Sequence, residues 1–295
     1  SAASSDYPLR DVYKRQQLMS RRMQIMGIFN VTPDSFSDGG QWTNEKALEE
    51  RIEQLISEGA DIIDVGGEST RPFAEPVSAE EELQRVLPAI KAIRRRSNIP
   101  ISIDTTKAVV AREAIAVGAT IINDISALRQ DAGMLTVVQS FAGQVVIMHM
   151  QGSPGDMQHN PRYSDVVAEI NAFFTERLTW LEANGVERSR IIVDPGIGFG
   201  KTLEHNLAIL RNIPAFKHHG CPVLIGHSRK SFLGELLGLP VAERDWPTAM
   251  ISAFAESAGA NIVRVHQVST TRLARQLMEA LVFTWFSGED NRGGD

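Results

Sequence analysis

The chain has 295 residues, of which 43% are hydrophobic and 22% are charged, values that are ordinary for a soluble globular protein. Its 36 acidic residues outnumber its 30 lysines and arginines, giving a formal net charge of −6. This balance argues against a nucleic-acid-binding protein, because such proteins present a basic surface. No run approaches about eighteen consecutive apolar residues, so no membrane-spanning helix is expected. The single cysteine, Cys221, excludes an internal disulfide and a thiolate metal cage, and it favours a cytoplasmic protein.

The two ends of the chain are polar and show no clear periodicity. Residues 1–22 lack the apolar segment of a secretory signal, and we interpret them as a disordered or expression-derived tail. Residues 287–295 are rich in glycine and charge, which is typical of a disordered tail. Residues 23–286 contain no linker rich in proline or serine. We therefore predict that they form one domain.

Short runs of β-branched and other apolar residues alternate with longer amphipathic stretches along this domain. The predicted strands are, in chain order, residues 23–29, 61–65, 99–104, 120–124, 144–148, 190–194, 222–225 and 261–265. Their apolar residues are continuous rather than alternating, as in strands buried on both faces of a parallel sheet. Predicted helices lie between them, among others at residues 45–57, 79–94, 107–117 and 164–183.

An internal repeat supports the same organisation. Residues 59–63 (GADII), 118–122 (GATII) and 259–263 (GANIV) share one pattern, in which a glycine ends a helix and a buried strand follows at once. Eight such units in about 265 residues predict a single-domain (β/α)8 TIM barrel of the α/β class. A doubly wound sheet is the alternative, but it would carry a glycine-rich phosphate turn after its first strand. Residues 30–34 read NVTPD there instead.

A polar or charged side chain stands at the end of every predicted strand. These are Asn30, Asp64, Asp104, Asn123 with Asp124, His149, Asp194, the run 228–230, and Arg264 with His266. In a barrel the carboxyl ends of all strands lie on one face, where active sites form. An Asp or Asn after a strand can instead cap the next helix. Capping does not account for Lys230, Arg264 or His266, so we predict a functional site on this face.

The residue types at this face indicate two kinds of ligand group. Carboxylates and an amide suit a flat heterocycle with several N–H groups; they are Asp104, Asn123 and Asp194. Cationic or potentially cationic side chains suit phosphate or carboxylate; they are Arg71, Lys230, Arg264 and His266. The amide oxygen of Asn30 can bind Mg²⁺, which commonly takes few protein ligands together with water and substrate phosphates.

Two other interpretations are weaker. Residues 200–202 (GKT) end like a P-loop, but the first glycine of that motif would fall at Pro195. A Schiff base on Lys230 would require a desolvated lysine, and its predicted position in a loop or first helical turn disfavours this chemistry.

Eight segments of the chain resemble dihydropteroate synthases, the folate-pathway enzymes that sulfonamides inhibit. They are residues 27–40 (GIFNVTPDSFSDGG), 64–72 (DVGGESTRP), 103–105 (IDT), 123–125 (NDI), 148–152 (MHMQG), 194–199 (DPGIGF), 228–231 (SRKS) and 264–266 (RVH). They occur in family order between residue 25 and about residue 285, and the first two are long and specific. The resemblance implies Mg²⁺-dependent transfer of the pterinylmethyl group of 6-hydroxymethyl-7,8-dihydropterin diphosphate to p-aminobenzoate. The products would be 7,8-dihydropteroate and diphosphate, and the enzyme would be a homodimer.

The resemblance also implies roles for individual residues. The pterin would be held by Asp104, Asn123, Met148, Asp194 and Lys230. The diphosphate would be held by Thr70, Arg264 and His266, with Mg²⁺ on Asn30. The p-aminobenzoate pocket would be formed by Phe36, Thr70, Arg71, Pro72, Phe199, Lys230 and Ser231. The groups expected to take part in catalysis are Asp104, Lys230, Arg264 and His266.

The implied reaction agrees with the chemistry of these side chains. Breaking the C–O bond leaves positive charge on the pterin methylene, which predicts a dissociative, SN1-like step. Cations would stabilise the departing diphosphate, while Asp104 would stabilise the cationic ring. An arylamine is neutral at pH 7 and needs no general base, in line with the lack of a recognisable Ser-His-Asp or Cys-His set.

Two positions depart from the family pattern. Phe73 stands where a glycine is more usual, beside the expected p-aminobenzoate residues, and His227 stands where a small or apolar residue is commoner. Neither has an assigned catalytic role, so activity is expected to be retained. We predict an altered response to sulfonamides.

Two alternative functions remain from the residues themselves. A pterin-dependent methyltransferase of the same barrel fold would share the Asp104, Asn123 and Asp194 set, but it would not need residues 30–36, 70–72 or 228–231. A non-catalytic pterin-binding protein is the second alternative, and the complete set of expected site residues disfavours it.

Overall fold

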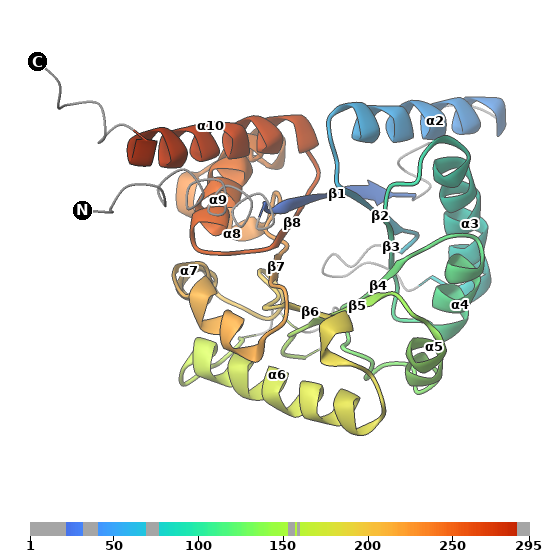
Figure 1. Cartoon of the computed structure of the whole chain (residues 1–295), viewed down its shortest axis with the longest axis horizontal. Helices are drawn as coiled ribbons and strands as arrows, with labels where there is room; N and C mark the ends of the chain where they lie inside the picture. Colours follow the sequence, from blue (N-terminus) through green and yellow to red (C-terminus); the bar gives the residue numbers. More distant parts are fainter. Residues whose placement is uncertain (1–21, 32–40, 69–76, 153–156, 158–159, 288–295) are drawn as a thin grey trace, which may run out of the picture.

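Eight parallel strands curl into a ring, and helices surround this ring on the outside (Figure 1). The computed structural model describes residues 22–31, 41–68, 77–152, 157 and 160–287. The strands are β1 (Gln24–Asn30), β2 (Ile62–Gly66), β3 (Ile101–Asp104), β4 (Ile121–Asp124), β5 (Gln144–Met148), β6 (Ile191–Asp194), β7 (Leu224–Ile225) and β8 (Ile262–Val265). Each of their ends lies within two residues of its predicted position, and the predicted TIM barrel is confirmed.

The outer layer consists mainly of α-helices. They are α2 (Gln41–Ser57), α3 (Ala79–Arg96), α4 (Ala108–Ala116), α5 (Met134–Ser140), α6 (Val166–Ala183), α7 (Leu203–Arg211), α8 (Ser231–Leu237), α9 (Asp245–Ser257) and α10 (Val268–Ser287). Short 3₁₀ turns add η2 (Arg188–Arg190), η3 (Ile213–His219) and η4 (Val241–Glu243). The four helices named from the sequence correspond to α2, α3, α4 and α6. None of the helices in the described ranges has the length and apolarity that crossing a membrane requires.

The regular elements extend from Gln24 to Ser287. The last helix thus passes the predicted domain end at residue 286 by one residue. The remaining parts of the two predicted tails, residues 1–21 and 288–295, lie outside the described residues.

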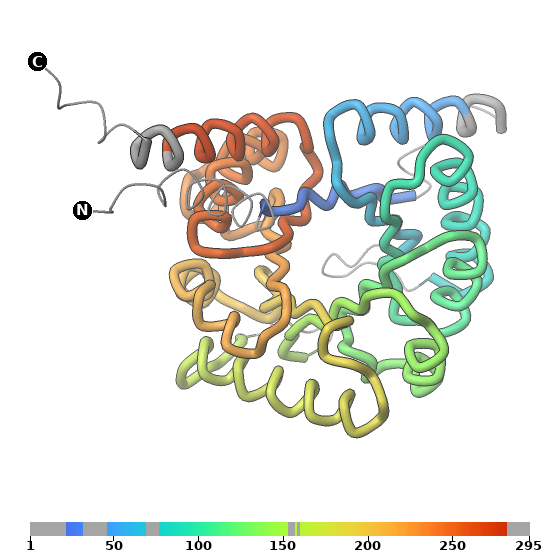
Figure 2. The backbone as a smooth tube through the Cα atoms, viewed as in Figure 1, coloured from blue at the N-terminus to red at the C-terminus, as the bar shows by residue number. Residues whose placement is uncertain are grey.

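The chain makes one circuit of the ring, so that its last strand returns to its first (Figure 2). The strand order is β6-β5-β4-β3-β2-β1-β8-β7. The ladder between β1 and β2 is long, from the pair Met26–Ile62 to the pair Asn30–Gly66. In the described chain β6 and β7 are joined by only one bridge, Val193–Val223. The barrel therefore closes at its weakest junction between these two strands.

The apolar core has two parts. A large cluster fills the space between the strands and the helices. A small separate cluster, here called the barrel floor, takes one residue from each of seven strands: Met26, Ile62, Ile121, Val146, Ile192, Leu224 and Ile262. Because strand side chains alternate between faces, the residue two positions further along each strand also points inward. Those positions include Asp64, Asn123, Asp194 and Arg264, so the interior changes from apolar to charged within one step of the strands.

The glycines of the internal repeat end helices, as the sequence predicts. Gly59, Gly118 and Gly259 have φ angles of 89°, 121° and 92°, which an L side chain rarely adopts. The Gly59 N–H donates to the carbonyl of Ile56 at 3.1 Å and closes the last turn of α2. Each glycine turns the chain directly into a buried strand.

Candidate active site at the carboxyl ends of the strands

One arginine joins two buried carboxylates inside the barrel. Arg264 of β8 donates from Nε to Oδ2 of Asp64 on β2 at 2.6 Å, and from Nη2 to Oδ2 of Asp104 on β3 at 2.7 Å. The amide nitrogen of Asn123 on β4 lies 3.5 Å from the same Asp64 oxygen. Two predicted catalytic residues, Asp104 and Arg264, are thus in direct contact. Asp64 itself is fully buried, and its Oδ1 has no hydrogen-bond partner among the described residues.

This contact sets the charges of the network. Burial raises the pKa of the Asp104 carboxyl to about 7, with Arg264 lowering it and Asp64 raising it. Burial also disfavours the Arg264 cation, but Asp64 and Asp104 outweigh this effect and raise its pKa above the ordinary value. Arg264 is therefore a fixed cation, whereas Asp104 titrates near neutrality.

Asp194 forms a second buried acceptor at the end of β6. Its Oδ1 accepts a hydrogen bond from the Gly196 N–H at 2.8 Å. Burial raises its pKa to about 6, while this hydrogen bond and the Lys230 charge lower it. Met148 of β5 pairs in register with Asp194 and is also buried. The structure therefore places a predicted pterin-binding carboxylate beside the predicted apolar platform.

Lys230 lies against an aromatic ring. Its Nζ is 3.9 Å from the ring centre of Phe199, a cation–π distance. Burial and Arg264 lower its pKa to about 8, while Asp194 and Asp104 oppose the shift. Phe199 belongs to a small buried apolar cluster, here called the methionine cluster, whose other members are Ile125, Met148, Met150 and Met157. Predicted residues for the pterin and for p-aminobenzoate thus meet at one cluster.

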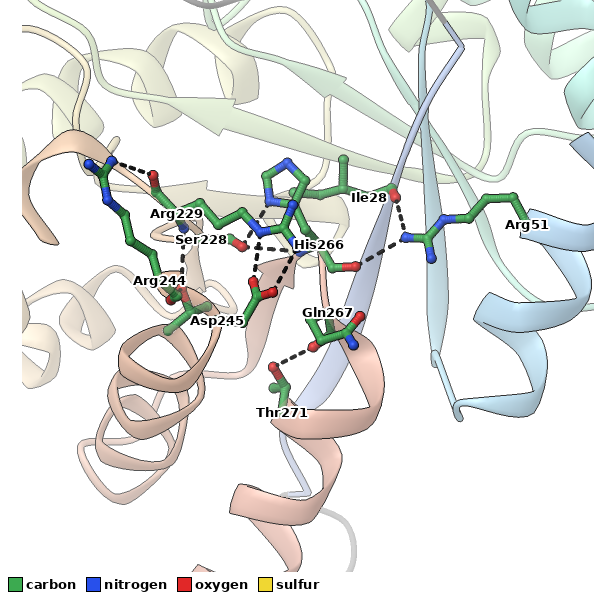
Figure 3. Close-up of polar contacts among 10 residues, drawn as sticks. Ile28, Arg51, Ser228, Arg229, Arg244, Asp245, His266, Gln267 and Thr271 are labelled. Carbon is green, nitrogen blue, oxygen red and sulfur yellow. Dashed lines mark hydrogen bonds and ion pairs between the residues drawn. The ribbon is translucent and has the colours of Figure 1, made fainter. Parts of the chain in front are cut away.

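His266 is held from two sides (Figure 3). Ser228 Oγ lies 2.9 Å from His266 Nδ1 and accepts from the His266 backbone N–H at 3.1 Å. Arg51 of α2 donates to the His266 carbonyl at 3.1 Å and to the Ile28 carbonyl at 3.4 Å. Both the ring and the backbone of this predicted diphosphate ligand are fixed by the surrounding protein.

The segment before α8 is braced by arginines (Figure 3). Arg229 has a positive φ of 56°, an unfavourable conformation for a long side chain. Its guanidinium forms two hydrogen bonds to Asp245 of α9, at 2.6 and 2.8 Å. Arg244 donates to the carbonyls of Arg229 and Lys230 at 3.2 and 3.4 Å. Ser231, the first residue of α8, is exposed.

Three other polar residues near the strand ends serve the fold. Both oxygens of Asp124 accept backbone N–H groups of the following turn, at 2.7 and 3.1 Å, so Asp124 holds this turn and does not cap the next helix, α5, which begins at Met134. His227 is fully buried, with Nε2 2.9 Å from the Thr248 carbonyl of α9. His149 is buried, and its pKa falls to about 3 because of burial and the charge of Lys201.

Five positions discussed from the sequence fall outside the described residues: Phe36, Thr70, Arg71, Pro72 and Phe73. The structure describes both flanks of residues 69–76, where Glu68 Oε1 accepts from the Val77 N–H at 3.0 Å. Lys107 Nζ donates to Oε2 of Glu68 at 2.5 Å and to Oε2 of Glu82 at 2.7 Å.

The sequence interpretation missed several residues that support the site. Asp64 appears among the strand-end residues, yet nothing in the sequence pairs it with Arg264, 200 positions away. The supporting roles of Arg51, Lys107 and Lys201 are also invisible, because their partners are mostly backbone carbonyls or distant glutamates. The sequence singles out Lys201 only as part of the GKT run, which does not form a P-loop.

The chain is similar to known enzymes over most of its length. The family model described as pterin binding enzyme matches residues 26–266. The dihydropteroate synthase of Escherichia coli strain K12 is 46% identical over 256 residues, which are 87% of this chain and 90% of that protein.

Solved structures agree with this similarity. A Yersinia pestis dihydropteroate synthase with a sulfonamide drug superposes with a TM-score of 0.84 at 42% identity, over 89% of this chain and 95% of the other. A Xanthomonas albilineans dihydropteroate synthase in complex with 7,8-dihydropteroate gives a TM-score of 0.80 at 41% identity, over 88% and 94%. The chain therefore belongs to the dihydropteroate synthase family of pterin-binding enzymes.

Proposed function

We propose that the chain transfers the pterinylmethyl group of 6-hydroxymethyl-7,8-dihydropterin diphosphate to p-aminobenzoate, forming 7,8-dihydropteroate and diphosphate in folate biosynthesis. The observation that carries this proposal is the meeting of buried acceptors and cations on one face of the barrel. Asp104 contacts Arg264 at 2.7 Å, and Lys230 covers Phe199 at 3.9 Å. The similar enzyme that binds 7,8-dihydropteroate supports the same product.

The pterin is recognised by buried hydrogen-bond acceptors. The ring edge of a dihydropterin presents several N–H donors, and Asp104, Asn123 and Asp194 provide oxygens for them. All three side chains are buried, so a hydrogen bond to an ionised carboxylate here is strong and specific. The fixed Arg264 cation favours the ionised form of Asp104.

The departing diphosphate and the pterin cation need opposite charges nearby. Lys230, Arg264 and His266 would stabilise the negative charge that develops on the leaving oxygen. Asp104 lies on the pterin side and stabilises positive charge on the ring. We propose an SN1-like step on this basis, because both kinds of charge lie on one face of the barrel, where Arg264 of β8 reaches Asp104 of β3 at 2.7 Å.

The acceptor p-aminobenzoate needs an apolar pocket for its ring and a polar group for its carboxylate. Phe199 supplies apolar surface, Lys230 and Ser231 supply polar groups at the same face, and Phe36, Thr70, Arg71 and Pro72 complete the proposed set. The arylamine attacks as a neutral nucleophile, and the proton released from its nitrogen after the C–N bond forms passes to water or to the departed diphosphate, so no side chain is assigned as a general base.

Asn30 fits a role as the protein ligand of Mg²⁺. Its side chain ends β1 and is exposed at the carboxyl-end face. In the described parts of the chain no group of three or more His, Cys, Asp or Glu side chains is placed to hold a metal. One amide oxygen therefore suits an ion that is carried mainly by substrate phosphates and water. When bound there, Mg²⁺ would neutralise part of the diphosphate charge.

We also propose that the chain is a cytoplasmic homodimer. Large apolar side chains are exposed along α9 and α10, which pack against each other. On α9 they are Trp246, Met250 and Phe254, and on α10 they are Leu273, Leu277 and Leu281. Both sets repeat every four residues and so form stripes on their helices. Large exposed apolar patches mark protein interfaces, and sedimentation of Leu277→Glu beside the unchanged chain would test this assignment.

One assay separates the candidate functions. The purified chain is incubated with pterin diphosphate, p-aminobenzoate and Mg²⁺, and 7,8-dihydropteroate is measured by mass spectrometry. We expect product that depends on both substrates and a lower rate after EDTA treatment. A full rate in EDTA would contradict the Mg²⁺ role.

The two alternative functions predict other outcomes. Methyl transfer from methyltetrahydrofolate to a corrinoid protein, without dihydropteroate formation, would establish the methyltransferase alternative. Tight pterin binding without either reaction would establish the non-catalytic one.

A further inference from the structure

Lys201 is a buried lysine with three hydrogen-bond acceptors around its Nζ. It lies between β6 and α7, and it is 3% exposed. Its Nζ donates to the Phe199 carbonyl at 2.9 Å and to the His149 carbonyl at 3.3 Å. The third acceptor is Nδ1 of His149, at 3.1 Å. The lysine therefore links the end of β5 to the loop that follows β6.

The protonation states fit this arrangement. His149 is a neutral ring at neutral pH, since burial and the Lys201 charge lower its pKa to about 3. Its Nδ1 can therefore accept from Lys201, which leaves the ring proton on Nε2. Burial lowers the pKa of Lys201 to about 7, although Asp194 opposes this shift. The protonated form of Lys201 has three N–H donors and its neutral form still has two, so Lys201 can donate to the protein in either form.

The loop that Lys201 holds has little conformational preference of its own. Gly196, Gly198 and Gly200 have φ angles of 73°, 79° and 61°, and glycine confers much backbone freedom in the absence of other contacts. Tyr163 Oη donates to the Gly200 carbonyl at 2.9 Å and supports the end of the loop. Lys201 is the side chain that reaches the carbonyl of Phe199, the loop residue whose ring lies under Lys230.

We propose that Lys201 is a positioning residue for p-aminobenzoate, acting by fixing the backbone of Phe199 against the end of β5. This role deepens the proposed function and rests on it. The Nζ of Lys201 is surrounded by three acceptors of the protein itself, so Lys201 acts on the substrate through Phe199.

The effect should fall on one substrate more than on the other. The pterin carboxylates Asp104 and Asp194 end strands and are held by sheet ladders. Phe199 lies five residues beyond Asp194, the last ladder position of β6, and its place depends on loop contacts. Releasing the loop at Phe199 would therefore loosen the p-aminobenzoate pocket. The pterin acceptors would keep their positions, because Gly196, which donates to Asp194, stays next to the end of β6.

The test is the substitution Lys201→Met, which keeps most of the side-chain volume and removes the N–H donors. We expect the KM for p-aminobenzoate to rise about tenfold or more, since a small misplacement of a positioning group has large kinetic effects. The KM for pterin diphosphate should change by less than about threefold. Hydrogen exchange of residues 196–200, followed by mass spectrometry, should become faster.

Arg190→Met is the matched control. Arg190 precedes β6 at the opposite end of the same strand, and it likewise donates to two backbone carbonyls, those of Gly143 and Val138, both at 2.9 Å. We expect this variant to lose a similar amount of stability and to keep both KM values. His149→Phe removes one acceptor and keeps an aromatic ring, so we expect a rise of about threefold in the same KM.

Each outcome decides the proposal. Unchanged KM for p-aminobenzoate in Lys201→Met overturns it, as does an equal rise in both KM values, which would indicate a general packing role. If Lys201→Met does not fold, His149→Phe decides, and an unchanged KM for p-aminobenzoate in that variant overturns the proposal. Absence of dihydropteroate formation by the unchanged chain and by Arg190→Met would instead refute the proposed function.

Discussion

The barrel floor and the polar side chains two residues further along the same strands affect folding in opposite ways. These polar side chains, Asp64, Asn123, Asp194 and Arg264 together with the neighbouring Asp104 and Lys230, are here called the charged layer. On β6, Ile192 belongs to the floor and Asp194, two residues later, is a buried carboxylate. Burying an apolar side chain contributes about 1.5–3 kcal/mol to folding. Burying a carboxylate is unfavourable, as the raised pKa of Asp194, about 6, records. On β6, the residue that stabilises the fold and the residue proposed to bind the ligand are thus only two positions apart.

The largest expected effect is the loss of ligand affinity when a residue of the charged layer is replaced. Asp194→Ala removes an acceptor of the charged layer, and we expect pterin affinity to fall at least about 100-fold, because hydrogen bonds to charged groups are strong. The free energy of unfolding should change much less than in a floor variant. Calorimetric titration with the pterin measures the first quantity and urea denaturation the second. Normal pterin affinity and turnover in Asp194→Ala would show that the pterin pocket is assigned wrongly.

The reciprocal change is Ile192→Ala in the barrel floor. It leaves a cavity among seven buried side chains, and such substitutions lower the free energy of unfolding by about 2–5 kcal/mol. We expect the KM values at low temperature to remain close to those of the unchanged chain. Urea denaturation and initial rates, measured on the same preparation, test both statements. A large rise in KM without loss of stability would show that floor and charged layer are not separable.

The pH dependence of kcat/KM for pterin diphosphate sharpens the comparison, since only the charged layer titrates. Burial raises the pKa values of Asp104 and Asp194 to about 7 and about 6. Protonation below these values removes acceptors, so activity should fall as the pH drops from 7 to 5. Burial lowers the pKa of Lys230 to about 8, so loss of its charge should reduce activity above that pH. Asp104→Asn should shift the acidic limb to lower pH, and an unshifted limb would show that Asp104 does not control it.

The smallest expected effect concerns Phe73, which lies outside the described residues. Phe73→Gly restores the residue that is more usual in the family at the predicted p-aminobenzoate pocket. We expect the inhibition constant of a sulfonamide to change by a few-fold, since one side chain in a pocket discriminates ligands only modestly. His227 is buried against Thr248 and Ser252 of α9, so the altered response is assigned to Phe73. An inhibition constant that stays the same in Phe73→Gly would contradict this assignment.

The sequence predicts the barrel well because each strand and its flanking glycine form a local pattern. Residues 59–63, 118–122 and 259–263 each combine a helix end with a buried strand, and the structure confirms all three. The strand-end residues also converge as predicted, because parallel strands in a barrel place their carboxyl ends on one face. Asp104 and Arg264 therefore meet although 160 positions separate them.

The supporting contacts could not be predicted, because they depend on side chains reaching distant backbone. Lys201 follows a glycine in a run that looks like part of a phosphate loop, and nothing local shows that its acceptors belong to His149 and Phe199. The same holds for Arg51, whose partner carbonyl on His266 is 215 positions away. A backbone carbonyl has no sequence signature, so such contacts appear only once the chain is folded.

A single bridge joins β6 and β7 in the described chain, and this junction is here called the seam of the barrel. Elsewhere a continuous ladder sets the spacing of neighbouring strands, but here Val193 and Val223 alone do so among the described residues. The two sides of the seam carry Asp194 and Lys230, and above it the Phe199 ring spans from one side to the Lys230 ammonium on the other. Side chains rather than sheet hydrogen bonds therefore hold the seam at the height of the site. Separating the two sides of this junction would break one bridge, whereas separating any other pair of neighbouring strands among the described residues would break a ladder.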